Sequence, residues 1–168
     1  MEGGINMALV TTKEMFKKAY EGQYAIGAFN INNMEILQGV MEAAKAEKSP
    51  VILQVSKGAL NYAGPKYLRA MVEAAVEDTG IDVALHLDHG SYEGCYKAME
   101  AGFSSVMFDG SHYPIAENIE KTQELVKVTS ERGLSLEAEV GSIGGEEDGV
   151  VGKGEVADPN ECKQIAEL

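Results

Sequence analysis

The sequence has no tryptophan, only two cysteines, and about half as many positively charged residues as negatively charged ones. Its 14 lysines and arginines against 27 aspartates and glutamates give a formal net charge of -13 at pH 7. This balance excludes nucleic acid and an anionic membrane as partners, because both require clustered positive charge. An anionic substrate would be repelled globally, so its site would need local cations, backbone N–H groups or a bound metal.

Features of a secreted or membrane-inserted protein are also missing. No apolar run approaches the roughly 18 to 20 residues that span a bilayer. The N-terminus has no signal-peptide pattern of basic, then apolar, then small residues. Cys95 and Cys162 lie far apart without metal-like spacing, so we interpret both as buried, reduced thiols. These observations predict a cytoplasmic protein.

Strand and helix patterns alternate five times along the chain. A length of 168 residues suits one domain, residues 1–168, with a sizeable core. The predicted strands are 24–30, 50–56, 84–88, 104–109 and 134–140. Helix patterns follow them at intervals of roughly 23 to 31 residues, which is typical of βα units. This alternation predicts a parallel sheet, either open and doubly wound or closed as a (β/α)₈ barrel.

Local signals predict where several helices begin and end. A capping box at 11–14 opens a short first helix. Asn32 and Glu35 begin the next, whose expected apolar face is Ile36, Val40 and Ala43. Pro65 begins a helix that Gly80 ends.

Nucleotide-binding glycine motifs are absent from their usual places. No G-x-G-x-x-G follows the first strand. The glycine-rich run 141–145 lacks a Walker lysine and follows the fifth strand, so we expect the acidic, glycine-rich segment 141–155 to be a loop rather than a phosphate cradle.

Each predicted strand ends in a polar or acidic side chain, and these residues are Asn30, Ser56, Asp88, Asp109 and Glu139. Strand alternation allows all five to share one face, which in a barrel is the mouth. Converging carboxylates repel one another and lose solvation, so a cation among them makes the arrangement tolerable. A polar residue can also end a strand because a loop begins there. Five such ends together favour a metal-dependent site.

The third strand runs into an acid, an imidazole and a glycine, and His89 lies where the strand stops and the chain turns. Asp88 beside His89 at a strand tip suits proton transfer next to a metal. The alternative is that Asp88 caps the following helix and His89 is solvated. We interpret His86 as a core histidine beneath the site, and His112 as a loop residue rather than a metal ligand.

Five motifs occur in order across nearly the whole chain: G-A-F-N (27–30), P-V-I-L-Q-V-S (50–56), H-L-D-H-G (86–90), V-M-F-D-G-S-H (106–112), and E-A-E-V-G (137–141) with G-G-E-E-D (144–148). In these residues the chain resembles the class II, metal-dependent fructose-bisphosphate aldolases, a family that also includes tagatose-bisphosphate aldolases. The resemblance implies a TIM (β/α)₈ barrel, of which this chain supplies about the first five βα units.

The resemblance also implies an activity and its partners. The expected reaction is reversible cleavage of fructose 1,6-bisphosphate to dihydroxyacetone phosphate and glyceraldehyde 3-phosphate, in glycolysis and gluconeogenesis. The implied cofactor is Zn²⁺, with a second divalent or monovalent cation. The implied partners are sugar bisphosphates, triose phosphates and further copies of the chain, in a dimer or tetramer.

Individual roles follow from the matching positions. Asp88 matches the acid/base at the scissile bond, and Glu147 matches the acid that takes a proton from dihydroxyacetone phosphate. His89 matches the first of three histidines that hold the catalytic zinc. The remaining matches are two ligands of a second cation site, Asp109 and Glu139, and two substrate-contacting positions, Asn30 and Ser56.

The chain departs from the family in extent. Three further strands, two zinc histidines and the phosphate-binding groups are expected beyond Leu168. The helix that Asp158 caps shows no stop signal before Leu168, which favours truncation. The alternatives to fructose-bisphosphate cleavage are a tagatose-bisphosphate aldolase, or a non-catalytic barrel fragment or assembly module.

Overall fold

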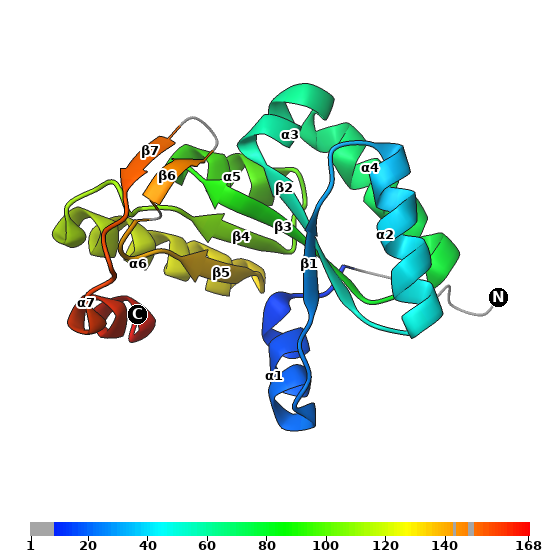
Figure 1. Cartoon of the computed structure of the whole chain (residues 1–168), viewed down its shortest axis with the longest axis horizontal. Helices are drawn as coiled ribbons and strands as arrows, with labels where there is room; N and C mark the ends of the chain where they lie inside the picture. The colour runs from blue at the N-terminus through cyan, green and yellow to red at the C-terminus, as the bar shows by residue number, and fades with distance from the viewer. Residues whose placement is uncertain (1–8, 143, 148–149) are drawn as a thin grey trace.

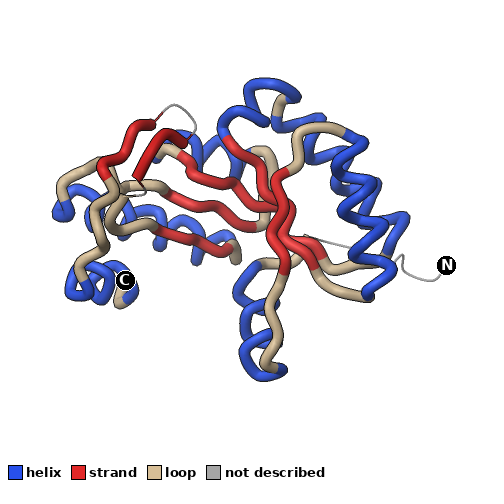
Figure 2. The backbone as a smooth tube through the Cα atoms, in the orientation of Figure 1, coloured by secondary structure: helices blue, strands red, loops and turns tan. Residues whose placement is uncertain are grey.

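The computed structural model describes residues 9–142, 144–147 and 150–168, with the backbone alone described at 146, 147 and 150–153. A five-stranded parallel sheet forms its centre, flanked by helices (Figures 1 and 2). The strands of this sheet are β1 (Gly27–Asn30), β2 (Val51–Ser56), β3 (Val83–Gly90), β4 (Ser105–Phe108) and β5 (Ser135–Ala138). The helices are α1 (Thr12–Gly22), α2 (Met34–Glu47), α3 (Lys57–Ala63), α4 (Pro65–Thr79), α5 (Tyr92–Glu100), α6 (Ile115–Arg132) and α7 (Pro159–Ala166).

The strand order decides between the two predicted architectures. The sheet runs β1-β2-β3-β4-β5, and every neighbouring pair is parallel. A doubly wound sheet reverses its strand order at a switch point, whereas a barrel adds each strand beside the last. The observed order has no reversal, so the chain forms five consecutive βα units of a barrel.

The main core lies between the outer face of the sheet and the helices. The outward side chains of the central strands are at most 1% exposed, and they are Leu53, Val55, Leu85, Leu87, Val106 and Phe108. They pack with helix residues such as Leu68 and Leu125 in one cluster. Burying each large aliphatic side chain contributes about 1.5–3 kcal/mol, so this layer stabilises the fold strongly.

Helix α1 covers the inner face at the amino ends of the strands. Met15 packs with Ile52 and Ala84 in a second, smaller cluster. The Lys13 N–H donates to Ser135 Oγ at 3.2 Å, at the start of β5. The predicted helix forms, but the capping box does not, because the Thr11 side chain makes no cap hydrogen bond.

The predicted apolar face of α2 is wrong by one residue. The buried side chains are Leu37, Met41 and Ala44, and the cap is Asn33 rather than Asn32. Helix α2 carries two adjacent apolar stripes, and the one nearer the sheet and α4 is buried. The other stripe contributes Val40 and Ala43 to a groove at the edge of β1.

Other predicted boundaries fare differently. Gly80 and Gly133 end α4 and α6 in the left-handed conformation, and Asp158 caps α7, as expected. Helix α3 was not expected. The segment predicted as a loop contains an antiparallel hairpin of β6 (Gly144–Glu147) and β7 (Val150–Lys153). Helix α7 ends at Ala166 with a cap at Glu167, so it does not run to Leu168.

Within the described residues, β1 and β5 each pair on one side only. Both edges carry apolar hollows, of about 410 Å³ beside Phe29 and Pro50 and about 580 Å³ beside Leu136 and Ile165. Cys95 is buried as expected, whereas Cys162 is exposed and lines the second hollow, which corrects the expectation for it. No helix in the described part is long and apolar enough to cross a bilayer.

Candidate metal centre and acid–base site

Asp88 lies at the carboxyl end of β3, held from two neighbouring strands. The Asn30 amide of β1 donates to Asp88 Oδ2 at 2.8 Å. The Gln54 amide of β2 donates to Asp88 Oδ1 at 3.0 Å. Each carboxylate oxygen therefore has its own donor, and hydrogen bonds to a charged acceptor are stronger than those between neutral groups. The two amides fix the orientation of the carboxylate.

His89 owes its direction to a bulge in β3. Strand alternation alone would place it on the face opposite Asp88. The β3–β4 register shifts between Leu87 and Gly90, and His89 has a left-handed φ of 48°. A β-bulge re-aims a side chain in this way. A non-glycine residue in this conformation costs about 1–2 kcal/mol, and such strain tends to gather at functional sites.

Gly90 makes the bulge sterically feasible. A Cβ at this position would lie 2.3 Å from Leu87 Cδ2 and 2.8 Å from the Met107 carbonyl oxygen. The backbone carbonyl of Gly90 also accepts from the Asp109 N–H at 3.0 Å. The absence of a side chain therefore lets β3 approach the end of β4, where the next acid follows.

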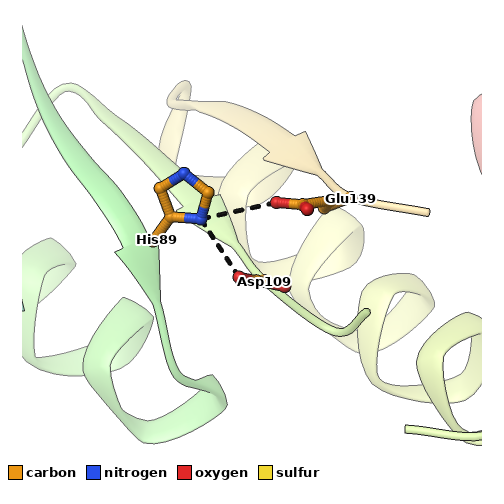
Figure 3. Close-up of side chains that lie close together, drawn as sticks. All are labelled: His89, Asp109 and Glu139. Atoms are coloured by element: carbon orange, nitrogen blue, oxygen red, sulfur yellow. Dashed lines mark hydrogen bonds and ion pairs between the residues drawn. The ribbon is translucent and has the colours of Figure 1, made fainter. Parts of the chain in front are cut away.

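His89, Asp109 and Glu139 form a three-donor cluster at the ends of β3, β4 and β5 (Figure 3). His89 Nδ1 lies 3.0 Å from Asp109 Oδ2 and 3.4 Å from Glu139 Oε2. One ligand atom from each residue lies within 4.8 Å of the others. The resemblance implies two cation sites, with His89 at the catalytic zinc and with Asp109 and Glu139 at the second site, whereas all three residues lie around one position in the structure.

The electrostatics of the cluster favour a cation. Burial acts to raise the pKa of Asp109, but hydrogen bonds from Ser111 and His89 outweigh it, so that the pKa lies below its ordinary value. Ser111 donates both its hydroxyl, at 2.6 Å, and its backbone N–H, at 3.1 Å, to Asp109 Oδ1. One imidazole nitrogen and two carboxylates are a donor set that zinc and similar divalent ions accept. The residues present therefore fit a divalent cation.

His86 lies beneath this cluster as a core histidine, as expected. It is 2% exposed, and burial lowers its pKa to about 4 despite the attraction of Asp88, so it is neutral at pH 7. Its Nδ1 lies 2.8 Å from Ser105 Oγ, and its Nε2 lies 3.4 Å from Glu137 Oε2. Burial and the nearby Asp88 raise the pKa of Glu137. Although a serine, a histidine and an acid meet here, Ser105 is 1% exposed and cannot reach a substrate.

The structure does not bring the remaining predicted residues, Ser56, Glu147 and His112, into the cluster that it shows among the described side chains. Ser56 pairs in register with Asp88, but its hydroxyl accepts from the Ala59 N–H and caps α3. The backbone of Glu147 belongs to β6, while its side chain lies outside the described part of the chain. His112 lies in the loop between β4 and α6, as expected, with its ring centroid 4.0 Å from that of Tyr113.

Sequence reasoning missed three residues that support the site. Gln54 lies two residues before Ser56 and therefore on the same face of the strand, so the alternation rule could have identified it. Asp109 and Ser111 have the spacing of an Asx turn, in which an aspartate side chain accepts from the backbone N–H two residues later. The sequence could therefore have identified Ser111. Asn118 of α6 donates to the backbone carbonyl of Glu139, but it sits within a helix pattern and no sequence signal points to it.

Known proteins of one family are similar to this chain. The family model for class II fructose-bisphosphate aldolase matches residues 10–168. The fructose-bisphosphate aldolase of Mycoplasma pneumoniae is 51% identical over 163 residues, which cover 95% of this chain and 57% of the relative. That of Streptococcus pyogenes serotype M1 is 47% identical, with coverage of 96% and 56%.

Solved structures show the same fold. The YdjI aldolase from Escherichia coli K12 superposes with a TM-score of 0.82 at 30% identity, covering 95% of this chain and 58% of that protein. A crystal structure described as a putative fructose-1,6-bisphosphate aldolase from Coccidioides immitis gives a TM-score of 0.81 at 31% identity, with coverage of 92% and 56%. The chain thus spans somewhat more than half the length of these proteins, and it belongs to the class II fructose-bisphosphate aldolase family.

Proposed function

We propose that this chain supplies the first five βα units of a zinc-dependent aldolase. The barrel that it helps to build reversibly cleaves fructose 1,6-bisphosphate to dihydroxyacetone phosphate and glyceraldehyde 3-phosphate in the cytoplasm. The observation that carries this proposal is the carboxylate of Asp88, oriented by two amides, directly beside the His89–Asp109–Glu139 cluster. The names of the relatives support the substrate.

Asp88 acts as the acid/base. Cleavage of a ketose bisphosphate between two carbons requires removal of a proton from the hydroxyl on one side of the bond, and condensation requires its return. A carboxylate held by Asn30 and Gln54 presents a defined oxygen to that hydroxyl, and such positioned proton transfer contributes typically 10²- to 10⁴-fold. Glu147, on the hairpin segment, exchanges the proton on the dihydroxyacetone phosphate carbon.

His89, Asp109 and Glu139 would hold the divalent cation. When bound, the cation supplies Lewis-acid stabilisation of negative charge that develops on the ketone oxygen. Three carboxylates lie at this end of the barrel, those of Asp88, Asp109 and Glu139, in a chain of net charge -13. The cation therefore also lowers the repulsion that an anionic sugar bisphosphate would meet. Asn30 and Ser56 would contact the substrate, and a second cation would assist its binding.

The two open edges support completion of the barrel by further βα units. Each edge combines unpaired strand groups with an apolar hollow, and such edges are normally covered. We assign catalysis to the completed barrel, in a dimer or tetramer. The alternative is a non-catalytic assembly module, because two of the three zinc histidines that the resemblance implies are expected beyond Leu168.

The test is a pair of variants in the intact protein. We expect Asp88→Ala to lower turnover of fructose 1,6-bisphosphate by about 10²- to 10⁴-fold while zinc content is unchanged. His89→Ala should lose zinc and activity together. Exchange of the dihydroxyacetone phosphate proton with solvent, measured by NMR, reports the half-reaction separately. Near-normal cleavage by Asp88→Ala would refute the acid/base assignment, and stoichiometric zinc in His89→Ala would refute the metal assignment.

A further inference from the structure

Asn118 is a buried amide on the first turns of α6, outside the cluster but in contact with two of its strands. It is 2% exposed. Its Nδ2 donates to the backbone carbonyl of Glu139 at 2.9 Å. Its Oδ1 accepts from the Thr122 hydroxyl at 3.2 Å, so the orientation of the amide is defined. A buried amide is costly unless its groups are satisfied, and here both ends have partners.

The same amide meets the chain directly after Asp109. A Cβ at Gly110 would lie 2.2 Å from Asn118 Oδ1 and 2.6 Å from its Cγ. Only a glycine allows the backbone to pass this close. Asn118 therefore lies between Gly110 and the backbone of Glu139. Gly110 follows one carboxylate ligand, Asp109, and Glu139 is the other carboxylate ligand. The two contacts of Asn118 therefore connect the ends of β4 and β5.

An apolar residue at position 118 would pack in the same space but would leave the Glu139 carbonyl without this donor. An unmade buried hydrogen bond costs about 1–3 kcal/mol, which the loop after β5 would avoid by moving towards water. Such a movement would carry the Glu139 carboxylate away from Asp109 and His89. Residues that orient metal ligands without contacting the metal typically change metal affinity by about 10- to 100-fold.

We propose that Asn118 is a positioning residue that sets the spacing of the Asp109 and Glu139 carboxylates for the cation. The inference rests on the proposed metal-dependent function. Thr122 assists by holding the Asn118 amide in the orientation that presents nitrogen to Glu139. Neither residue touches the cation or the substrate.

The test compares three variants of the intact protein by zinc titration. Asn118→Asp keeps the shape and replaces the donor by an acceptor, so we expect zinc affinity to fall about 10- to 100-fold. Thr122→Val removes the orienting hydroxyl and should weaken binding in the same direction by less. Thr129→Val is the matched control. Thr129 is equally buried on the same helix, but its hydroxyl donates to the Leu125 carbonyl, far from the site. It should lower thermal stability without changing zinc affinity.

Backbone hydrogen exchange of the metal-free protein provides a readout that does not depend on zinc. Asn118→Asp should speed exchange at 109–111 and 139–141, and Thr129→Val should not. Equal zinc affinity in Asn118→Asp and Thr129→Val would overturn the proposal. If the unmodified protein bound no zinc through His89, the proposed function would fail, and hydrogen exchange alone would decide the role of Asn118. Unchanged exchange at both segments would then refute it. If Asn118→Asp did not fold, Thr122→Val would be compared with Thr129→Val in the same two measurements.

Discussion

The Gln54 amide of β2 donates to Asp88 Oδ1 of β3 at 3.0 Å. In the register of these two strands, Asp88 aligns with Ser56, two residues after Gln54. The donor comes from a neighbouring strand and lies two residues before the strand end. Its position depends on the sheet, which is more rigid than a loop. The proposed acid/base is thereby oriented by the scaffold itself.

Replacement of Gln54 by alanine should therefore impair catalysis without loss of the metal. With Asn30 as the remaining amide donor, the Asp88 carboxylate can rotate away from the substrate hydroxyl, and a misplacement of about 1 Å can cost 10²-fold. We expect kcat to fall roughly 10- to 100-fold, with a smaller change in KM. Gln38→Ala, on the exposed side of α2, is the control. Unchanged kcat in Gln54→Ala would show that Asn30 alone suffices.

The left-handed backbone of His89 predicts an unusual stability order. Both His89→Ala and His89→Gly remove the imidazole, so their difference reports the backbone alone. At φ 48°, alanine carries the left-handed strain and glycine does not. We expect His89→Gly to have a free energy of unfolding about 1–2 kcal/mol higher than His89→Ala, measured by urea denaturation without metal. In an ordinary strand glycine is the less stable of the two, so equal stability or the usual order would argue against the bulge.

Burial of His86 predicts a loss of stability on the acid side. Its pKa is about 4 in the folded state against an ordinary value of 6.5, so the unfolded chain binds this proton first as the pH falls. The stabilisation is complete above pH 6.5 and is lost progressively down to pH 4. Replacement by glutamine should make this decline shallower, as measured by urea unfolding across that range. His112→Gln keeps His86 and should retain the steep decline. Identical pH profiles for the two variants would contradict a neutral buried His86.

The two thiols should react at very different rates. Burial raises the pKa of Cys95 to about 12, and its Sγ donates to the Met107 carbonyl. The thiolate is the reactive form, so Cys95 should be inert at neutral pH, whereas the exposed Cys162 should react readily. In the 168-residue chain, a chromogenic disulfide reagent should titrate one thiol in native buffer and two in denaturant. Cys162→Ser should abolish the fast reaction, and a persistent fast phase in that variant would show that Cys95 is accessible.

Much of the fold could be predicted because its signals are local. The apolar runs of β2 and β3 and the glycines at 80 and 133 each act through their own backbone or immediate neighbours. The face of α2 could not be predicted in this way. Its two apolar stripes are equivalent in sequence, and only packing against the sheet and α4 chooses between them.

The strand-end residues illustrate the same division within the site. By itself the sequence determined that acidic and amide side chains would meet at the ends of parallel strands, because strand parity and βα alternation are local properties. Only the tertiary structure decided that His89 joins them, since a bulge turns it against the alternation rule and depends on the close approach of β3 and β4 at Gly90. Likewise, the amides of Gln54 and Asn118 gain their roles from partners 34 and 21 residues away, whose positions the folded sheet alone brings within hydrogen-bonding distance.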